Sequence, residues 1–304
     1  MMNTIKKSIA SIPVIGPAAQ WAYRRSGLRH GTKEDIKSSA PRIAIGYSTM
    51  ERTHFTLRTV RGLDADERID IFWCDGSASP AARKVPSPKY FKRARLKEIH
   101  YDITGGADAV IQYALRRMLS LGYDYIGLLE NDILLEDGWL PAIMDAFEAG
   151  RRDQLRVGAV TTRTIESRIL FHRPGYAAMW NMGAGMVIFT REAVEAVLAD
   201  YHTTGSQSVG EYWKQWGFDL DAWELWMDQP NRGLGADWWY AVAMMNKGLV
   251  CIGSVPSLAD NIDVDLEDFC RTTHSRRSLA NEPLQSEAYE LFMSKYSPLK
   301  SKVA

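Results

Sequence analysis

The sequence predicts an α/β fold, in which a mostly parallel sheet is sandwiched by helices. Three observations predict it: apolar runs of strand length, amphipathic stretches of helix length between them, and turn residues at their junctions. The chain has 304 residues, 46% of them apolar, which is enough for one large core. We expect residues 41–280 to form this domain, between an N-terminal extension (1–40) and a C-terminal tail (281–304).

The first half of the domain alternates strands and helices. Apolar runs predict buried strands over 42–48, 69–74 and 125–129, and the second run ends at an Asp-Gly turn signal. Apolar residues recur at the spacing of one helix face over 107–119, and a similar stripe predicts a helix over 139–147. This rhythm is typical of a parallel sheet with helices on both faces.

The second half continues the pattern. We expect a strand over 186–189, helices over 191–199 and 237–246, and a late strand over 250–252. A tryptophan-rich segment precedes the last helix, and four of its apolar residues have helical spacing, which favours packing in the core. These four are Trp216, Leu220, Trp223 and Met227.

The charge balance excludes one class of partner. The chain carries 37 basic and 37 acidic side chains, so no whole-chain field draws it to nucleic acid.

Its three cysteines, Cys74, Cys251 and Cys270, are an odd number without a CxxC pair. We interpret them as reduced packing residues of a cytoplasmic protein rather than as disulfides or zinc ligands.

Basic residues are concentrated in the N-terminal extension, where seven Lys or Arg and two acids give a net charge of +5. Its apolar residues include Trp21 and Tyr23 but are interrupted by Pro13 and Pro17, so the stretch is too broken to span a bilayer. It suits a segment on an anionic membrane surface, peripheral to the inner face of the cell membrane. A leader docking on its own domain fits equally well, and a cleaved signal peptide fits less well because of the prolines.

A second basic run covers residues 83–97, with seven Lys or Arg and no acid. Such a run is usually a solvated face. The alternative is contact with anionic lipid headgroups or with a pyrophosphate group, together with the N-terminal extension.

Polar residues follow each of the three strands predicted in the first half. They are Thr49, Glu51 and Arg52 after the first strand, Asp75 after the second, and Glu130, Asn131 and Asp132 after the third. In open α/β sheets ligands bind beyond the carboxyl ends of the strands, so we expect these residues to line one crevice.

The acidic tripeptide predicts a cation site. Glu130 and Asp132 are alternate residues at a strand end, so their carboxylates point to the same side. Two oxygen ligands open to solvent suit Mg²⁺ or Mn²⁺ completed by phosphates of a substrate. The alternative is that Asp132 or Asp137 only caps a helix.

Five motifs in order carry a resemblance to a known family. They are residues 71–77, Gly105-Gly106 opening a helix, and residues 122–132, 183–189 and 235–239. Together they resemble the nucleotide-sugar half of family 2 glycosyltransferases with the Rossmann-like GT-A fold. The resemblance implies an inverting, metal-dependent transfer of a sugar from a nucleoside diphosphate donor to a saccharide or lipid-linked acceptor, in cell-surface glycan assembly.

The resemblance also implies residue roles. Asp75 matches the residue that holds the nucleobase, Glu130 and Asp132 match the DxD metal motif, and Asp237 matches the base that activates the acceptor. Thr49, Glu51, Arg52, Gly105, Gly106 and Asn131 are expected to complete the donor site. Two residues depart from the family pattern. Glu130 replaces the usual first Asp, which leaves Asp132 as the better-supported ligand, and Ala236 stands where many members have a second acid.

Asp237 has a simpler alternative as a helix N-cap, since it precedes a helical pattern. As a base it would take the proton of the acceptor hydroxyl, and attack opposite the leaving group would invert the anomeric carbon. Trp238 and Trp239 could present flat faces to a sugar ring.

Residues 273–277 are similar to a tail of some bacterial members whose His joins the metal and the diphosphate. His274 would then be a metal ligand and Arg276 a diphosphate contact. A solvated loop is the alternative, because the acidic residues 263–268 replace glycines expected in such a tail.

Two other functions compete with a transferase. A sugar-phosphate nucleotidyltransferase would want a glycine-rich loop after the first strand, and residues 49–54 contain no glycine. A catalytically inactive carbohydrate-binding relative is conceivable because of Glu130 and Ala236.

Overall fold

A computed structural model describes residues 41–104, 106–164, 168–179, 182, 186–199 and 236–262 of the chain. The chain divides into two units, Met1–Ala40 and Pro41–Ala304. Several predictions fall outside the described residues: the N-terminal extension, Gly105, the tryptophan stripe at 216–227, Cys270, His274, Arg276 and the tail. They stay predictions.

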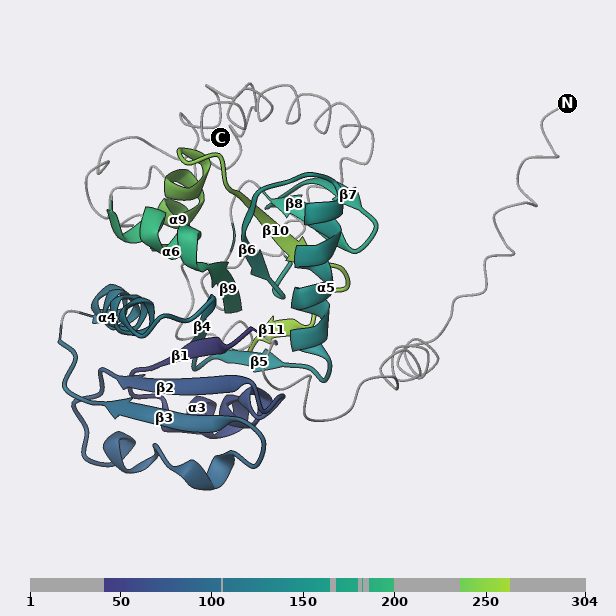
Figure 1. The fold of residues 1–304 in the computed structure, drawn as a ribbon. Coiled ribbons are helices and arrows are strands. Elements are labelled where there is room, and N and C mark those ends of the chain that lie inside the picture. Colours follow the sequence, from purple (N-terminus) through teal and green to yellow (C-terminus); the bar gives the residue numbers. More distant parts are fainter. Residues whose placement is uncertain are drawn as a thin grey trace, which may run out of the picture. The chain divides into compact units, whose positions relative to one another are not determined.

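The core of the second unit is a nine-stranded mixed sheet with the order β3-β2-β1-β4-β9-β6-β10-β8-β7 (Figure 1). The strands are β1 (Ile43–Thr49), β2 (Ile69–Asp75), β3 (Arg95–His100), β4 (Tyr125–Glu130), β6 (Val157–Thr161), β7 (Ile169–Arg173), β8 (Tyr176–Met179), β9 (Met186–Thr190) and β10 (Val250–Ser254). The pairings make β8 and β9 antiparallel to their neighbours, so the other seven strands share one direction. The mostly parallel α/β sheet predicted from the sequence is confirmed.

Helices cover both faces of this sheet. They are α3 (Thr53–Thr59), α4 (Gly106–Ser120), α5 (Trp139–Arg152), α6 (Arg191–Ala199) and α9 (Ala236–Met245). One face packs on the apolar stripe of α5, and the opposite face packs on α4, α6 and α9. Alternate residues of β1 enter the two cores, with Ile43 and Ile45 in the first and Ala44 in the second, as the period of a strand requires.

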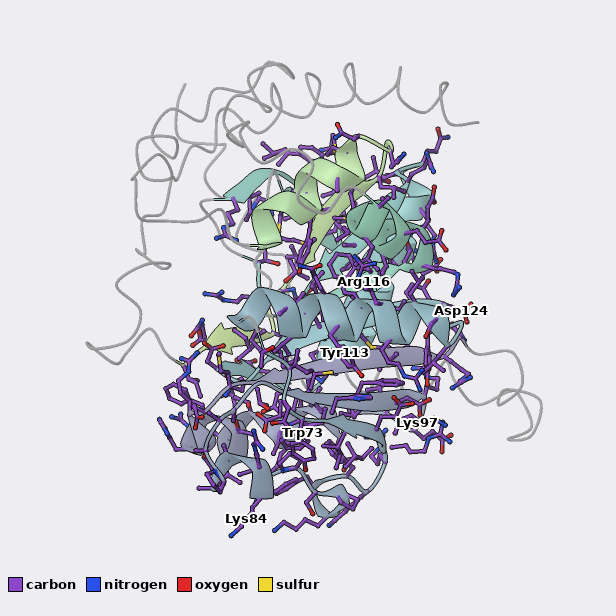
Figure 2. The ribbon with its side chains drawn as sticks, turned by 90° about the vertical axis from the view of Figure 1, so that its left-hand side faces the viewer. Trp73, Lys84, Lys97, Tyr113, Arg116 and Asp124 are labelled. Atoms are coloured by element: carbon purple, nitrogen blue, oxygen red, sulfur yellow. The ribbon has the colours of Figure 1, made fainter. Side chains whose placement is uncertain are left out.

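Helix α4 lies close to β1 because Gly46 has no side chain. A Cβ at Gly46 would stand 2.8 Å from the Cβ of Ala114, closer than carbon atoms approach. The stripe predicted for this helix is confirmed where it is described, since Val110, Ala114 and Met118 are fully buried. Helix α4 packs on β1, β4 and β2, and Figure 2 shows it running alongside the strands.

The structure contains elements that the sequence did not predict. A two-stranded sheet pairs β5 (Ile133–Leu135) with β11 (Ala259–Asn261), and the short helices η1 (Val60–Leu63), η2 (Ala82–Lys84) and η3 (Pro88–Tyr90) lie in connections. The basic run 83–97, predicted as a solvated face, also contains the first three residues of the edge strand β3, which continues to His100. Cys74 and Cys251 are buried, and burial raises the pKa of the Cys74 thiol to about 12, which agrees with packing roles.

Asp70 in β2 is a buried carboxylate held by two arginines and a tyrosine. Arg95 donates to both its oxygens at 2.7 and 2.8 Å, Arg42 donates at 2.8 Å, and the Tyr123 hydroxyl donates at 2.5 Å. Burial alone would raise the pKa of Asp70, but the hydrogen bonds from Tyr123, Arg42 and Arg95 outweigh it and lower the pKa. The cluster ties the amino ends of β1 and β2 to the turn before β4.

We expect Asp70→Asn to destabilise the fold by about 1–3 kcal/mol at pH 7, because hydrogen bonds from charged groups to a carboxylate are lost. A carboxylate with a depressed pKa in the folded state stabilises above its unfolded pKa of about 4, and this contribution is lost as pH falls. Urea unfolding should therefore show a gap in unfolding free energy between wild type and variant that is constant from pH 7 to about pH 5 and narrows as pH falls below about 4. A gap that is constant with pH would contradict this account. The exposed Asp137, changed to Asn, is the matched control.

Candidate functional site

The chain reverses its direction of travel across the sheet beside β1. It passes from β1 to β2 and β3 on one side and returns to β4 on the other side. In open α/β sheets this switch point, at the carboxyl ends of the strands, is where ligands bind. Thr49 is paired with Asp75, and the neighbouring Ser48 with Glu130, so the three strand ends lie side by side. The site is built at this point.

Asp75 ends β2 and is held rigidly by its neighbours. Its Oδ1 accepts hydrogen bonds from the Thr49 hydroxyl at 3.0 Å, from the Ser77 amide at 3.1 Å and from the Ser77 hydroxyl at 2.6 Å. Thr49 is itself oriented by Trp73, whose indole N–H donates to the Thr49 Oγ1 at 3.0 Å. Asp75 is only 1% exposed, and within the described ranges its Oδ2 has no hydrogen-bond partner.

Among the described residues, none donates a hydrogen bond to the second oxygen of Asp75, which is therefore a fixed acceptor. An unsatisfied buried acceptor costs about 1–3 kcal/mol, so its presence in a native structure calls for an explanation. A ligand N–H is the explanation that suits the strand end of a switch point. Sequence reasoning did not assign a role to Ser77, although Asp-Gly-Ser after a strand is a signal for the Asx-type turn that Ser77 completes.

The loop after β1 has an unusual backbone. Glu51 and Arg52 both have positive φ, 51° and 42°, a region that residues other than glycine seldom adopt. Hydrogen bonds to the loop after β2 hold Glu51 in this conformation. Its amide donates to the Ser77 Oγ at 2.7 Å, and its Oε1 accepts from the amides of Ala78 and Ser79 at 2.8 and 2.9 Å. Glu51 thus binds the loop after β2. Its predicted contact with a nucleotide-sugar donor stays a prediction.

These contacts also affect the charge of Glu51. Hydrogen bonds from Ser79, first its side chain and then its amide, lower the pKa of Glu51, and the Ala78 amide adds to them. Glu51 is therefore a carboxylate over the whole neutral range. Strained backbone of this kind is concentrated at functional sites, which agrees with the position of the loop at the switch point.

The conformation of Arg52 directs its guanidinium to the acidic tripeptide. Its Nη2 lies 3.3 Å from the Asp132 Oδ2, and its guanidinium lies over the Phe55 ring, 5.4 Å from the centroid. Asp132 is 6% exposed and Glu130, the last residue of β4, is half-buried. Asp132 thus takes part in an ion pair in this structure, and it does so at the switch point rather than at a helix cap.

Asn131 fixes the tripeptide to α3. Its side-chain amide donates to the Thr56 Oγ1 at 3.1 Å, and its main-chain carbonyl accepts from the Thr59 hydroxyl at 3.1 Å. Thr59 also shares a 2.7 Å hydrogen bond with the Tyr47 hydroxyl. The predicted contact of Asn131 with a donor stays a prediction, because its side chain is used to position the loop.

The turn that carries Asp132 is also held by a segment that lies about 130 positions later in the sequence. The Ile262 amide donates to the Asp132 carbonyl at 2.9 Å, directly after β11 pairs with β5. A hydrogen bond from the Ser257 hydroxyl to the Thr162 carbonyl, 2.9 Å long, holds the connection before β11 in place. Residue 262 thus lies beside the tripeptide, and the segment with His274 and Arg276 that follows lies outside the described residues.

The donor set fits a hard divalent cation only in part. Glu130 and Asp132 supply two carboxylates at one strand end, the ligand type that Mg²⁺ and Mn²⁺ prefer when phosphates and water complete the shell. Within the described part of the chain no group of three His, Cys, Asp or Glu side chains could hold a metal ion. A third protein ligand would have to come from elsewhere, and His274 is the sequence-based candidate.

The remaining predicted residues are placed by their backbone alone. Helix α4 begins at Gly106, and α9 begins at Ala236, so Asp237 lies in the first turn of α9 together with Trp238 and Trp239. Helix α9 packs against α6 and β10. The side chains of Asp237, Trp238 and Trp239 are outside the described set, so the acceptor roles stay predictions.

Comparison with known proteins gives one fold-level likeness. No protein-family model matches the sequence, and no curated protein matches it. Solved structures do match, among them a mannosyltransferase from Pyrobaculum calidifontis in complex with GDP-Man and Mn²⁺. That match has 13% sequence identity and a TM-score of 0.44, and it covers 88% of this chain and 68% of the other. A likeness at this level does not establish a shared activity.

Proposed function

We propose that this chain is an inverting glycosyltransferase of the GT-A type, which uses Mn²⁺ or Mg²⁺ to move a sugar from a nucleoside diphosphate donor to a saccharide or lipid-linked acceptor. The observation that carries the proposal is the pair of carboxylates at one switch point. Asp75 offers a rigid acceptor oxygen. On the other side of β1, Asp132 offers a carboxylate beside the Arg52 guanidinium. A donor has two matching parts, a base with an N–H group and a diphosphate.

Each residue has a role in this proposal. Asp75, oriented by Thr49 and Ser77, accepts a hydrogen bond from the nucleobase. Glu130 and Asp132 would hold the divalent cation. Arg52, now paired with Asp132, lies where its guanidinium could bind a phosphate oxygen of the donor instead. A bound divalent cation would stabilise the negative charge that develops on the leaving diphosphate.

The acceptor half of the proposal rests on the sequence. Asp237 would take the proton of the acceptor hydroxyl, and Trp238 and Trp239 would stack on the acceptor sugar. A single base opposite the leaving group gives inversion.

The contact between Glu51, after β1, and the loop after β2 disfavours the nucleotidyltransferase alternative. A phosphate-cradling loop uses glycines so that successive amides can point to one anion. Here the Glu51 carboxylate occupies the amides of Ala78 and Ser79, and it would repel an anion at that place.

Calorimetric titration of UDP, GDP and dTDP, each with and without Mn²⁺, tests the proposal. We expect one nucleotide to bind, and to bind at least about tenfold more tightly with Mn²⁺. A hydrolysis assay with the corresponding sugar donors then separates an enzyme from an inactive binding relative. If no nucleotide binds under either condition, the proposal is wrong.

Asp75→Asn is a near-isosteric test of the base contact. The amide can keep its oxygen toward Thr49 and Ser77, but it then presents an NH₂ donor where the nucleobase needs an acceptor. We expect nucleotide affinity to fall about 10–100-fold, the equivalent of 1–3 kcal/mol. Asp137→Asn, an exposed carboxylate just before α5, should bind as the wild type does. Unchanged affinity of the Asp75 variant would remove Asp75 from the site.

A further inference from the structure

Five cations lie on the β3 edge of the sheet, and we call this surface the basic edge. They are Lys84, Lys89, Lys92, Arg93 and Lys97, all exposed. Figure 2 labels Lys84, at the lower margin of the view, and Lys97, to the right, both below α4. Among the described residues none of the five takes part in an ion pair.

Four carboxylates near this edge are already engaged. Asp64 accepts hydrogen bonds from the amides of Lys92, Arg93 and Ala94 at 2.6–2.9 Å, so its charge supports the backbone of the loop. Asp66 pairs with Arg68, Asp70 with Arg42 and Arg95, and Glu98 with Arg117. Of the five cations, Arg93 is the one whose charge acts on Asp64 and Asp66. The four lysines remain as positive charge facing solvent.

Protection of a sheet edge explains only part of this surface. Strand β3 is the terminal strand of the sheet, and an exposed lysine such as Lys97 hinders pairing with a second chain. Lys84 and Lys89 belong to η2 and η3, and Lys92 and Arg93 to the loop before β3. Four of the five therefore stand outside the strand, where no edge needs protection.

We propose that the basic edge docks this protein on an anionic membrane surface. Four of the five cations come from short helical turns and the loop before β3, and the fifth from β3 itself. Clustered exposed Lys and Arg of this kind are attracted to anionic lipid headgroups. No described helix has the length and apolarity to cross a bilayer.

The aromatic residues among the cations argue against single-stranded nucleic acid. A nucleic-acid groove needs exposed rings on which bases stack. Tyr90 and Phe91 are half-buried and pack on the sheet core, and the Tyr90 ring lies 6.3 Å from the Trp73 ring. The zero net charge of the chain also removes the long-range attraction that supports non-specific nucleic-acid binding.

The basic edge is joined to the candidate site. Arg83, the residue before Lys84 in η2, donates from its Nε to the Ser77 carbonyl at 3.2 Å, and Ser77 holds Asp75. Docking by this edge would bring the Asp75 end of the site toward the headgroups, where a lipid-linked acceptor would be. This last step rests on the proposed function, whereas the docking does not.

Co-sedimentation of the full chain with vesicles tests the inference. We expect binding to phosphatidylcholine vesicles with 30% phosphatidylserine, no binding to pure phosphatidylcholine, and release at 0.5 M NaCl. A variant with Lys89, Lys92 and Lys97 changed to Gln should bind at least about tenfold more weakly. A matched variant with Arg116, Arg152 and Lys247 changed to Gln removes the same charge from other exposed positions, and its binding should stay within about twofold of wild type.

Three outcomes would overturn the inference. The first is equal binding by the basic-edge variant and the wild type, and the second is tighter binding of the wild type to single-stranded RNA than to the anionic vesicles at the same salt. The third is loss of binding only when Lys6, Lys7 and Arg24 of the N-terminal extension are changed to Gln. Nucleotide titration of each variant keeps the two proposals apart, because the basic-edge variant should retain wild-type affinity for nucleotide.

Discussion

Asp132→Asn should abolish Mn²⁺-dependent nucleotide binding, with a loss of affinity of about 100-fold or more. A carboxylate is the hard anionic ligand that Mn²⁺ and Mg²⁺ require, whereas a neutral amide binds them weakly. With Glu130 as the remaining carboxylate, the described part of the site would keep a single anionic ligand. Calorimetry with Mn²⁺ and nucleotide, together with the electron paramagnetic resonance signal of free Mn²⁺, measures the loss.

The ion pair with Arg52 makes a control necessary, because Asp132→Asn also removes the partner of a guanidinium. Arg52→Gln breaks the same contact and leaves the carboxylate in place. If Asp132 binds the cation, the Arg52 variant keeps binding free Mn²⁺. If Asp132 only holds Arg52, the two variants lose nucleotide binding equally, and Asp132 is then a structural residue. Equal thermal midpoints of the two variants would show that the difference is not one of folding.

The fold could be predicted where burial leaves either a continuous apolar run or a helical period in the sequence. Strands β1, β2 and β4 begin or end within one residue of the predicted ranges, and α6 matches its prediction. These elements are buried on both faces or amphipathic, so their pattern is strong. The direction of β9 could not be predicted, because a fully buried run such as Met186–Thr190 is apolar whichever way it pairs.

Other elements were missed for identifiable reasons. β3 reads Arg-Leu-Lys-Glu-Ile-His, in which four of the six residues are polar because the strand lies at the edge of the sheet. β5 and β11 have three residues each, too few for a period, and they pair across more than 120 positions of sequence. A contact between Ile262 and Asp132 follows from that pairing and has no local signal.

The site was predictable as a set of residue types but not as a set of contacts. Polar residues after three strands indicated where Thr49, Asp75 and Asp132 would meet. The sequence could not show that Glu51 and Asn131 are used within the protein, because a carboxylate or amide binds a backbone group as readily as a ligand. Which oxygen of Asp75 remains open depends on Ser77, two residues further on.

Asp237→Asn should reduce turnover at least about 100-fold while it leaves donor affinity nearly unchanged. A carboxylate that takes a proton from the acceptor hydroxyl contributes typically 10²–10⁴-fold, and an amide cannot accept that proton. Asparagine is chosen because it caps a helix about as well as aspartate, and loss of one negative charge in the first turn of α9 costs only about 0.3–1 kcal/mol. A role restricted to the helix end therefore predicts normal turnover and a nearly normal thermal midpoint. Steady-state rates with saturating donor, set beside the calorimetric affinity of the same variant, decide between base and cap.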